Sequence, residues 1–309
     1  MLKASCVFLL QTLTTTKKHK QSLLKAHVVS FCPPPHPPPM ACRIHTVWDP
    51  MGWLCLSSIV FVWSYNTWLL PKLIMMPHVA QGTLPAAVAA GYYVVAALCM
   101  AALVRASTAD PGRVRQERDM SSEEFSVQSH VCQKCSIVKP ARAHHCSRCG
   151  HCVRRMDHHC PWINNCVGEG NQWLFIQLCF YTQLLSTYAL VVNFAHFYLL
   201  PPLASAQPDE FVFHYSVAML RGAAVMGVMI FLGMAALFYG QVINILTDLT
   251  TIEKMKDPFL EVSAQVQRPW QESLAAVFGT RWKLLWLIPC RRGGVQGISA
   301  RRYSYQAAV

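Results

Sequence analysis

The sequence predicts an α-helical integral membrane protein with four transmembrane helices and a cysteine-rich cytosolic domain between the second and third of them. Composition is the first observation behind this fold class, because 53% hydrophobic and only 14% charged residues is unlike a soluble protein. The second is a set of four long runs without Asp, Glu, Lys or Arg, and the third is a group of seven cysteines between the second and third runs.

The four uncharged runs cover Trp53–Leu70, Leu84–Val104, Trp173–Leu200 and Gly222–Leu246. Each is long enough to cross a hydrocarbon core, which takes about 17 to 25 helical residues. The first, at 18 residues, is the weakest, although tryptophans such as Trp68 are typical of membrane interfaces. Buried core helices of a large soluble protein are the alternative, and four such runs in one short chain argue against it.

Lysine and arginine are distributed unevenly around these runs. Ten lie between Arg105 and Gln172 and nine from Thr247 onward, whereas the opposite loops hold Lys72 and, at a boundary, Arg221. Because Lys and Arg accumulate in cytoplasmic segments, we expect both termini and the cysteine-rich domain in the cytosol. The lysines and arginines behind the net charge of +12 lie beside the spans, where lipid headgroups and phosphorylated small molecules are the nearer partners. We therefore do not expect nucleic acid to bind.

We expect five segments along the chain: an unstructured N-terminal extension at 1–39, spans one and two in 40–112, the cysteine-rich domain at 113–172, spans three and four in 173–246, and a cytosolic C-terminal region at 247–309. The extension has no acidic residue and carries prolines from Pro33 to Pro39, which favour an extended spacer. A transit peptide is the alternative, and Met40 is an alternative start.

Two further segments adjoin the spans. Asp110-Pro111-Gly112 is a turn sequence that should end the second helix as it leaves the membrane. Between Trp270 and Ile288 apolar residues recur at helical spacing, which predicts an amphipathic helix. That helix would lie on the membrane surface or pack against the cytosolic domain, and the pattern fits both.

The cysteines of the middle loop are spaced like metal ligands, and in a reducing compartment such cysteines favour metal over disulfides. Zinc takes four nitrogen or sulfur ligands, and a Cys-x2-Cys turn supplies two of them. Two sites need eight ligands, so at least one histidine must join the seven cysteines. A pair of Cys3His sites would leave one cysteine free, and spacing alone does not say which. The candidates are Cys132, Cys135, Cys146, Cys149, Cys152, Cys160 and Cys166, with His144, His145, His151, His158 and His159.

The tetrapeptide Asp157-His158-His159-Cys160 resembles the motif of the DHHC-type zinc-finger protein S-acyltransferases, or palmitoyltransferases. Asp110-Pro111-Gly112, the cysteine-rich domain and Thr250-Thr251-Ile252-Glu253 follow the order found in that family, and the resemblance extends from Met40 to about Arg292. Longer strings resemble one four-span mammalian member in particular. One departure is Ser273, where family members usually carry an asparagine.

The resemblance implies which residues bind zinc and which do chemistry. It places Cys132, Cys135, His145 and Cys152 at one structural zinc site and Cys146, Cys149, His159 and Cys166 at the other. Cys160 is then the nucleophile, His158 its general base and Asp157 the residue that orients His158. The implied activity is transfer of a long acyl group from palmitoyl-CoA to cysteine thiols of membrane-associated proteins, through an acyl-enzyme on Cys160. Support of a neighbouring metal ligand is the alternative role for His158.

Five polar residues are expected to bind the coenzyme A donor. Arg148, Arg154 and Arg155 flank the tetrapeptide and carry guanidinium groups that suit phosphates, with solvated surface as the alternative. Thr250 and Thr251 follow the last span. The resemblance implies that this motif packs beside Asp157, and a hydrogen bond at a helix terminus is the alternative.

Two other classes of protein compete with the enzyme. A membrane-anchored zinc-binding interaction module would not need a spare thiol beside His158 and Asp157. A small transporter would usually carry charged residues inside its spans, and these runs carry none. We expect the protein in the Golgi or endoplasmic reticulum membrane, with the plasma membrane as a further location.

Overall fold

The protein is described from a computed structural model, which covers residues 45–115, 130–203, 210–257, 269–279 and 286–289. All of these residues belong to one structural unit, Cys42–Val309. The expected N-terminal extension at 1–39 and most of the polar segment that follows Arg113 lie outside the described residues.

Long helices make up the first part of the fold. Their bounds are α1 Pro50–Leu70, α3 Ala86–Thr108, α4 Gln172–Tyr198 and α5 Glu210–Thr247. Within the described residues, four helical segments are long and apolar enough to cross a membrane: Pro50–Ala80, Ala86–Thr108, Gln172–Tyr198 and Tyr215–Thr247. These segments confirm the predicted class, and the chain is a multi-pass α-helical membrane protein.

The first span is longer than its uncharged run. Asp49 caps α1 by accepting a hydrogen bond from the Met51 amide (3.3 Å), and Pro50 occupies the first helical position, where a missing amide proton costs little. After Leu70 the helix continues through the π-helix η1 (Pro71–Met75) into α2 (Met76–Ala80). A π-helical turn is wider than an α-helical one and leaves room for the ring of Pro71.

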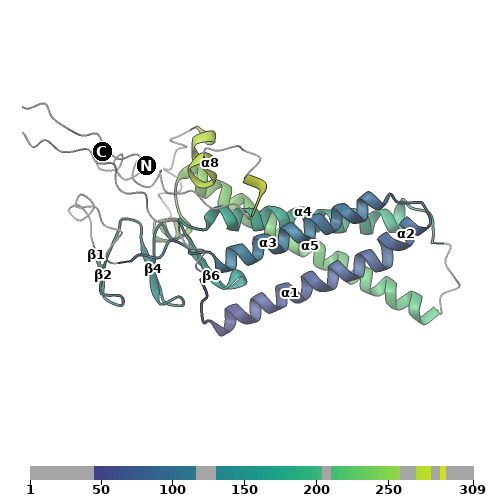
Figure 1. The fold of residues 1–309 in the computed structure, drawn as a ribbon, viewed down its shortest axis with the longest axis horizontal. Helices are drawn as coiled ribbons and strands as arrows, with labels where there is room; N and C mark the ends of the chain where they lie inside the picture. The colour runs from purple at the N-terminus through teal and green to yellow at the C-terminus, as the bar shows by residue number, and fades with distance from the viewer. Residues whose placement is uncertain (1–44, 116–129, 204–209, 258–268, 280–285, 290–309) are drawn as a thin grey trace, which may run out of the picture. The chain divides into compact units, whose positions relative to one another are not determined.

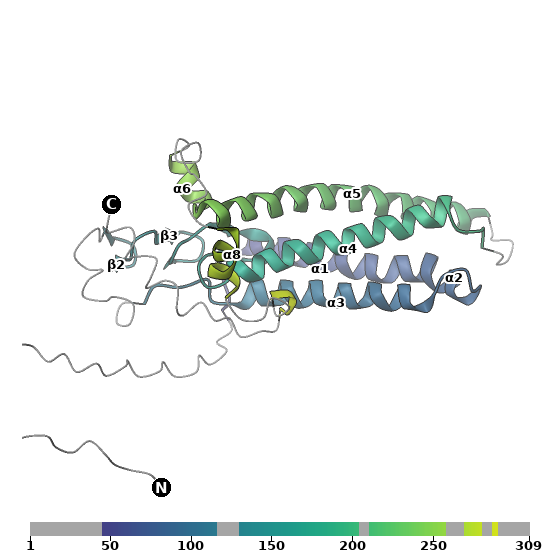
Figure 2. The same ribbon diagram turned by 90° about the horizontal axis from the view of Figure 1, so that it is seen from above.

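The four spans lie side by side, and α4 packs against both α3 and α5 (Figures 1 and 2). One buried apolar cluster joins α3, α4 and α5 and includes Trp173, Leu174 and Ile245. Large apolar side chains on the outward faces remain exposed, among them Phe61, Val191 and Met229. An apolar exterior of this kind suits contact with lipid tails.

Three short antiparallel hairpins gather at the end of the bundle where α1 begins and α5 ends (Figures 1 and 2). Their strands are β1 His130–Cys132 with β2 Ile137–Lys139, β3 His144–Cys146 with β4 His151–Val153, and β5 His158–Cys160 with β6 Asn165–Val167. The short 3-10 helix η2 (Pro161–Ile163) follows β5 and contacts α1. Strands of three residues cannot bury a core of their own, so the hairpins need another source of stability.

Two short helices lie at the same end of the bundle (Figure 2). They are α6 (Thr251–Lys256) and α8 (Trp270–Phe278). Helix α8 buries Val277 and Phe278 against the spans and contacts α4 and α5. The helix expected from Trp270 to Ile288 therefore ends early, at Gly279, whose φ of 84° is a left-handed conformation that suits glycine.

Candidate active site and metal centres

The hairpins bring the eight expected zinc ligands together in two groups. One group contains Cys132, Cys135, His145 and Cys152, and the other contains Cys146, Cys149, His159 and Cys166. In each group the ligand atoms lie within 4.8 Å of one another. The strand pairing produces this interleaving, because His145 is opposite Cys152 in one hairpin and His159 is opposite Cys166 in another.

The second group has the dimensions of a tetrahedral zinc site. Its Cys149 and Cys166 sulfurs are 3.4 Å apart, and His159 Nδ1 lies 3.6, 3.3 and 3.7 Å from the sulfurs of Cys146, Cys149 and Cys166. Zinc–sulfur bonds of about 2.3 Å and zinc–nitrogen bonds of about 2.0 Å in a tetrahedron place their ligand atoms roughly 3.5 to 3.8 Å apart. The donor set and the spacing therefore fit a fully ligated, structural metal site.

The ring of His159 is also supported on its other side. Its Nε2 lies 3.5 Å from the carboxylate of Asp49, which is buried and also pairs with Arg148 at 3.2 Å. Asp49 caps α1, so one carboxylate joins the start of the first span to the histidine of the second metal group. At 3.5 Å the two atoms do not form a hydrogen bond, but a carboxylate this close favours one orientation of the ring and makes it a better ligand.

The hairpin that carries the tetrapeptide is fixed to the second span. The Asn165 side-chain amide donates to the carbonyls of Ala106 (3.2 Å) and Ala109 (2.9 Å) at the end of α3. The turn at Asp110 follows, and its carboxylate accepts from the Gly112 and Arg113 amides at 2.9 and 2.8 Å. The expected helix-ending turn is thus present, and it docks the metal-binding hairpins on the membrane helices.

The free cysteine lies at the boundary between the hairpins and the spans. All seven cysteines of the loop are described, and Cys160 stands outside both metal groups. It is 6% exposed and packs in the apolar cluster with Ile163 and Trp173. A buried thiol among apolar side chains needs a nearby base to become a thiolate.

The neighbouring residues provide that base. His158 Nδ1 donates to Asp157 Oδ2 at 2.7 Å, and Phe175 packs edge-on against the imidazole with ring centroids 5.3 Å apart. Burial would lower the pKa of His158, but its hydrogen bonds to Asp157 and Cys160 raise it to about 9. The imidazole is therefore suited to hold a proton taken from the Cys160 thiol.

Asp157 is the most heavily bonded residue of the site and is only 1% exposed. It accepts from the Thr251 amide (2.8 Å) and hydroxyl (3.0 Å), from Gln241 Nε2 (2.9 Å) and from Asn244 Nδ2 (3.1 Å), besides His158. Burial would raise the pKa of this carboxyl, but His158 and the other donors lower it to about 2. Asp157 therefore stays ionised, as orienting a protonated imidazole requires.

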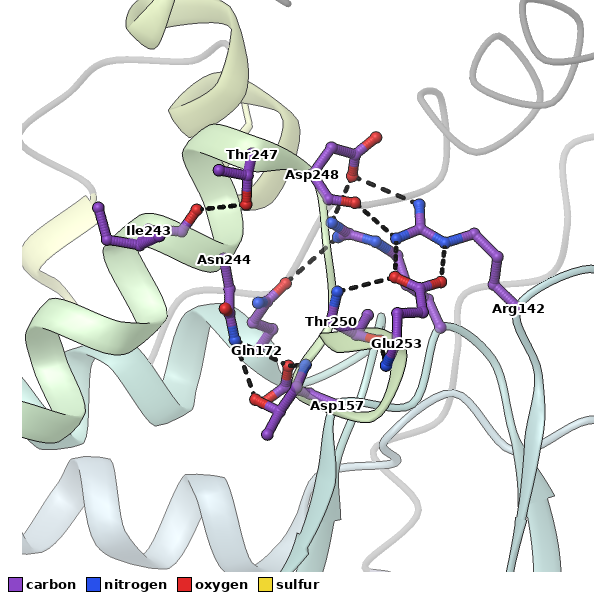
Figure 3. A network of polar contacts seen from close by, with 11 residues as sticks. Arg142, Asp157, Gln172, Ile243, Asn244, Thr247, Asp248, Thr250 and Glu253 are labelled. Atoms are coloured by element: carbon purple, nitrogen blue, oxygen red, sulfur yellow. Dashed lines mark hydrogen bonds and ion pairs between the residues drawn. The ribbon is translucent and has the colours of Figure 1, made fainter. Parts of the chain in front are cut away.

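A second polar network ties the metal-binding hairpins to the segment after span four (Figure 3). The Arg142 guanidinium donates to Glu253 through Nε (2.6 Å) and Nη2 (2.7 Å), and Nη2 also donates to the Asp248 carbonyl (2.6 Å). Arg155 lies beside it and donates to the Asp248 carboxylate at 2.5 Å. Glu253 in turn accepts from the Thr250 amide at 2.8 Å, which completes a capping box at the start of α6.

The structure shows which partner each of the five residues expected to bind coenzyme A has inside the protein. Arg148 pairs with Asp49 and Arg154 with Glu169, with side chains 55% and 33% exposed. Arg155 is 7% exposed and holds Asp248 and Gln172. Thr250 caps α6 and Thr251 bonds to Asp157. The helix-terminus alternative thus describes the Thr250 side chain.

Sequence reasoning missed the amides on span four and the role of Arg142. Gln241 and Asn244 lie in a run defined by its lack of charged residues, and uncharged amides do not interrupt such a run. Their spacing of three residues, which places them on one helix face near the span's end, was the available signal. Nothing in the sequence alone singles out Arg142 from the other cations of the loop.

Fold and site together define a class: a multi-pass helical membrane protein that holds two Cys3His metal groups and a cysteine–histidine–aspartate arrangement at one end of its spans. Comparison with known proteins gives the family. Residues 126–258 match the DHHC palmitoyltransferase family. The chain is 53% identical over 252 residues to Palmitoyltransferase ZDHHC21 of Danio rerio, which covers 82% of this chain and 94% of that relative.

Two other relatives agree with this result. Palmitoyltransferase ZDHHC21 of Homo sapiens is 51% identical over 253 residues, covering 82% of this chain and 95% of the relative. Palmitoyltransferase ZDHHC7 of Mus musculus is 30% identical over 262 residues, covering 81% and 82%. The chain therefore belongs to the DHHC palmitoyltransferase family, as the tetrapeptide and the order of the motifs predicted.

Proposed function

We propose that the protein is a protein S-palmitoyltransferase that moves a long acyl group from palmitoyl-CoA to cysteine thiols of membrane-associated proteins. The single observation that carries the proposal is the position of Cys160, which is the one cysteine of the middle loop outside both metal groups and lies two residues from His158 on strand β5. Family membership over most of the chain supports the same reaction.

The reaction proceeds in two exchanges between thioesters. His158 takes the proton of the Cys160 thiol, and the thiolate attacks the carbonyl carbon of the acyl thioester. The carbon–sulfur bond to coenzyme A breaks, and the leaving thiolate takes the proton from His158. In the second exchange His158 accepts the proton of a substrate cysteine, whose sulfur displaces Cys160 from the acyl group and regenerates the free enzyme.

The resident metal in this proposal is zinc, held by the two Cys3His groups. Each group supplies four ligands, so zinc would complete a tetrahedron and hold the hairpins rather than activate substrate. Metal binding would also supply the stability that strands of three residues lack. The residues that do chemistry are then those of the chain, with Asp157 and His158 acting on Cys160.

Among the residues expected at coenzyme A, Arg148 and Arg154 remain our candidates for the phosphates, because their side chains are 55% and 33% exposed. Their bonds to Asp49 and Glu169 would loosen as the phosphates arrive. Arg155, Thr250 and Thr251 are engaged inside the protein and would act by holding the site together.

The bilayer is the protein's second partner, and the hairpins, α6 and both termini would face the cytosol. The cations that flank the second and fourth spans support this orientation, because positive residues favour the cytoplasmic side. In this arrangement Cys160 lies where a water-soluble acyl-CoA and a lipid-embedded acyl chain meet. We propose the Golgi or endoplasmic reticulum membrane, with the plasma membrane as a further location.

The test compares the wild-type chain with Cys160→Ser, purified in detergent and incubated with labelled palmitoyl-CoA. We expect hydroxylamine-sensitive label on the wild type, no label on Cys160→Ser, and about two zinc ions per chain in both. Cys179→Ser is the matched control, because Cys179 is also buried in the apolar cluster with Cys160. The Cys179→Ser chain should still take up label. Label that survives in Cys160→Ser would favour a membrane-anchored interaction module.

A further inference from the structure

Two amides inside the fourth span face the carboxylate of Asp157. Gln241 Nε2 donates to Asp157 Oδ2 at 2.9 Å, and Asn244 Nδ2 donates to Asp157 Oδ1 at 3.1 Å. Both side chains are about as buried as the carboxylate, with exposures of 5% and 4%. Figure 3 shows Asn244 projecting from α5 toward Asp157.

The two amides act on different oxygen atoms, and that fixes the plane of the carboxylate. Thr251 approaches from another direction, with its amide on Oδ1 (2.8 Å) and its hydroxyl on Oδ2 (3.0 Å). Asn244 also donates to the Thr251 hydroxyl at 3.0 Å. Each oxygen of Asp157 is thus held both by span four and by the start of α6, so the group cannot rotate without breaking several bonds.

The orientation of Asp157 decides where the imidazole points. His158 donates its Nδ1 proton to Oδ2, the same oxygen that accepts from Gln241. A rotation of the carboxylate would therefore turn the ring and move Nε2 relative to the Cys160 thiol. Proton transfer needs donor and acceptor within hydrogen-bond reach, so a small rotation slows the chemistry.

A purely structural role for the amides fits less well. Buried amides in a membrane helix are expensive unless every polar atom is bonded, and among the described residues Gln241 Oε1 is buried without a hydrogen-bond partner. An apolar side chain of the same size would avoid this cost at Oε1, although it would leave Asp157 with one donor fewer. What the amide adds is a fixed hydrogen-bond donor directed at Asp157.

We propose that Gln241 and Asn244 are positioning residues of the acyl-transfer site. Their amides hold the Asp157 carboxylate in one plane and, through it, direct His158 toward Cys160. The inference rests on the proposed function, because it assigns the amides to the loading of Cys160 by palmitoyl-CoA.

The test uses shape-matched apolar variants of the full chain, Gln241→Met and Asn244→Leu, purified in detergent. Single-turnover loading of Cys160 is measured over a range of palmitoyl-CoA concentrations. We expect the maximal loading rate to fall about tenfold or more in each variant, since a bond to a charged group is lost. The palmitoyl-CoA concentration at half-maximal rate should stay within about twofold, because both amides donate to Asp157 inside the protein.

Asn193→Leu is the matched control. Asn193 is a buried amide of span three that donates to the Leu220 carbonyl at 3.1 Å, and Leu220 belongs to a different apolar cluster from Cys160. Its loss should leave the maximal loading rate unchanged. Zinc content and the thermal midpoint of each variant establish that it is folded. If Asn244→Leu does not fold, the result for Gln241→Met decides. The Gln241 amide donates to Asp157, whereas the Asn244 amide donates to Asp157 and also to Thr251.

A double-mutant cycle separates positioning from general stability. In an Asp157→Ala background the carboxylate is gone, so Gln241→Met should change the residual loading rate by less than about twofold. An equal loss in both backgrounds, or wild-type loading in both amide variants, would overturn the inference. A wild-type chain that takes no label from palmitoyl-CoA would instead refute the proposed function, and the two failures are thus distinguishable.

Discussion

Replacing Arg142 with methionine should weaken the connection between the metal-binding hairpins and the segment after span four. The guanidinium makes two parallel bonds to the Glu253 carboxylate at 2.6 and 2.7 Å and a third to the Asp248 carbonyl. The two side chains of the ion pair are 15% and 18% exposed, so solvent screens them only in part. Burial would raise the pKa of Glu253, but Arg142 lowers it, as a close guanidinium should.

The magnitude follows from the geometry. A hydrogen bond to a charged group contributes about 1.5 to 3 kcal/mol, and breaking a fully buried ion pair from one side costs about 3 to 5 kcal/mol. Partial exposure places Arg142→Met below that upper range, at about 2 to 3 kcal/mol of unfolding free energy. The loss also reaches Asp157, because Thr251 follows the N-cap residue Thr250 and donates to that carboxylate.

A double-mutant cycle of Arg142→Met with Glu253→Gln measures the pair itself. Denaturant titration of the detergent-solubilised chain should give a coupling free energy of about 2 kcal/mol. The control is Arg115→Gln, since Arg115 lies 3.5 Å from Asp110 with both side chains well exposed and should contribute less than about 1 kcal/mol. A coupling below about 0.5 kcal/mol between Arg142 and Glu253 would refute the reasoning.

Three further changes test other parts of the structure. Asp49→Asn should release zinc to a chelator about tenfold faster than wild type, because the carboxylate no longer supports His159; unchanged release kinetics would contradict the contact. Gly52→Ala should destabilise the chain by about 1 to 3 kcal/mol, because an added Cβ would lie 2.1 Å from Asn164 Oδ1. Gly222→Ala is the matched control, since a Cβ there meets nothing within 4 Å, and the thermal midpoint should not fall. Removing metal with a chelator should abolish Cys160 loading while far-ultraviolet circular dichroism retains the signal of the spans; loss of both together would show that the spans depend on the metal.

Much of the architecture follows from local properties of the sequence. The thickness of the hydrocarbon core sets the length of an uncharged run, so four such runs predict four spans without knowledge of their packing. The metal groups are local as well, because Cys-x2-Cys turns bring two ligands together within a few residues. Spacing left one cysteine over without identifying it, and resemblance to the family selected Cys160.

Local pattern was less reliable where helices end. The uncharged run of the first span stops at Leu70, yet the helix continues through Pro71 to Ala80, because a π-helical turn accommodates the proline. The apolar periodicity from Trp270 to Ile288 predicts a longer helix than the one that ends at Gly279. In both cases the conformation of a single turn decides whether the helix continues or ends, and the apolar periodicity does not predict that conformation.

How the Asp157 carboxylate is held depends on contacts between distant parts of the chain. The partners of Asp157 on α5 and α6 lie 84, 87 and 94 residues away in the sequence. Their approach depends on how span four packs beside the hairpins, and no local propensity encodes that packing. Short stretches of chain are enough to predict the spans and the candidate metal ligands, and resemblance to the family assigns those ligands to two groups. The resemblance already implied that the Thr250–Thr251 motif packs beside Asp157. The Gln241 and Asn244 donors and the Arg142 network could not be predicted, because they depend on how distant segments pack together.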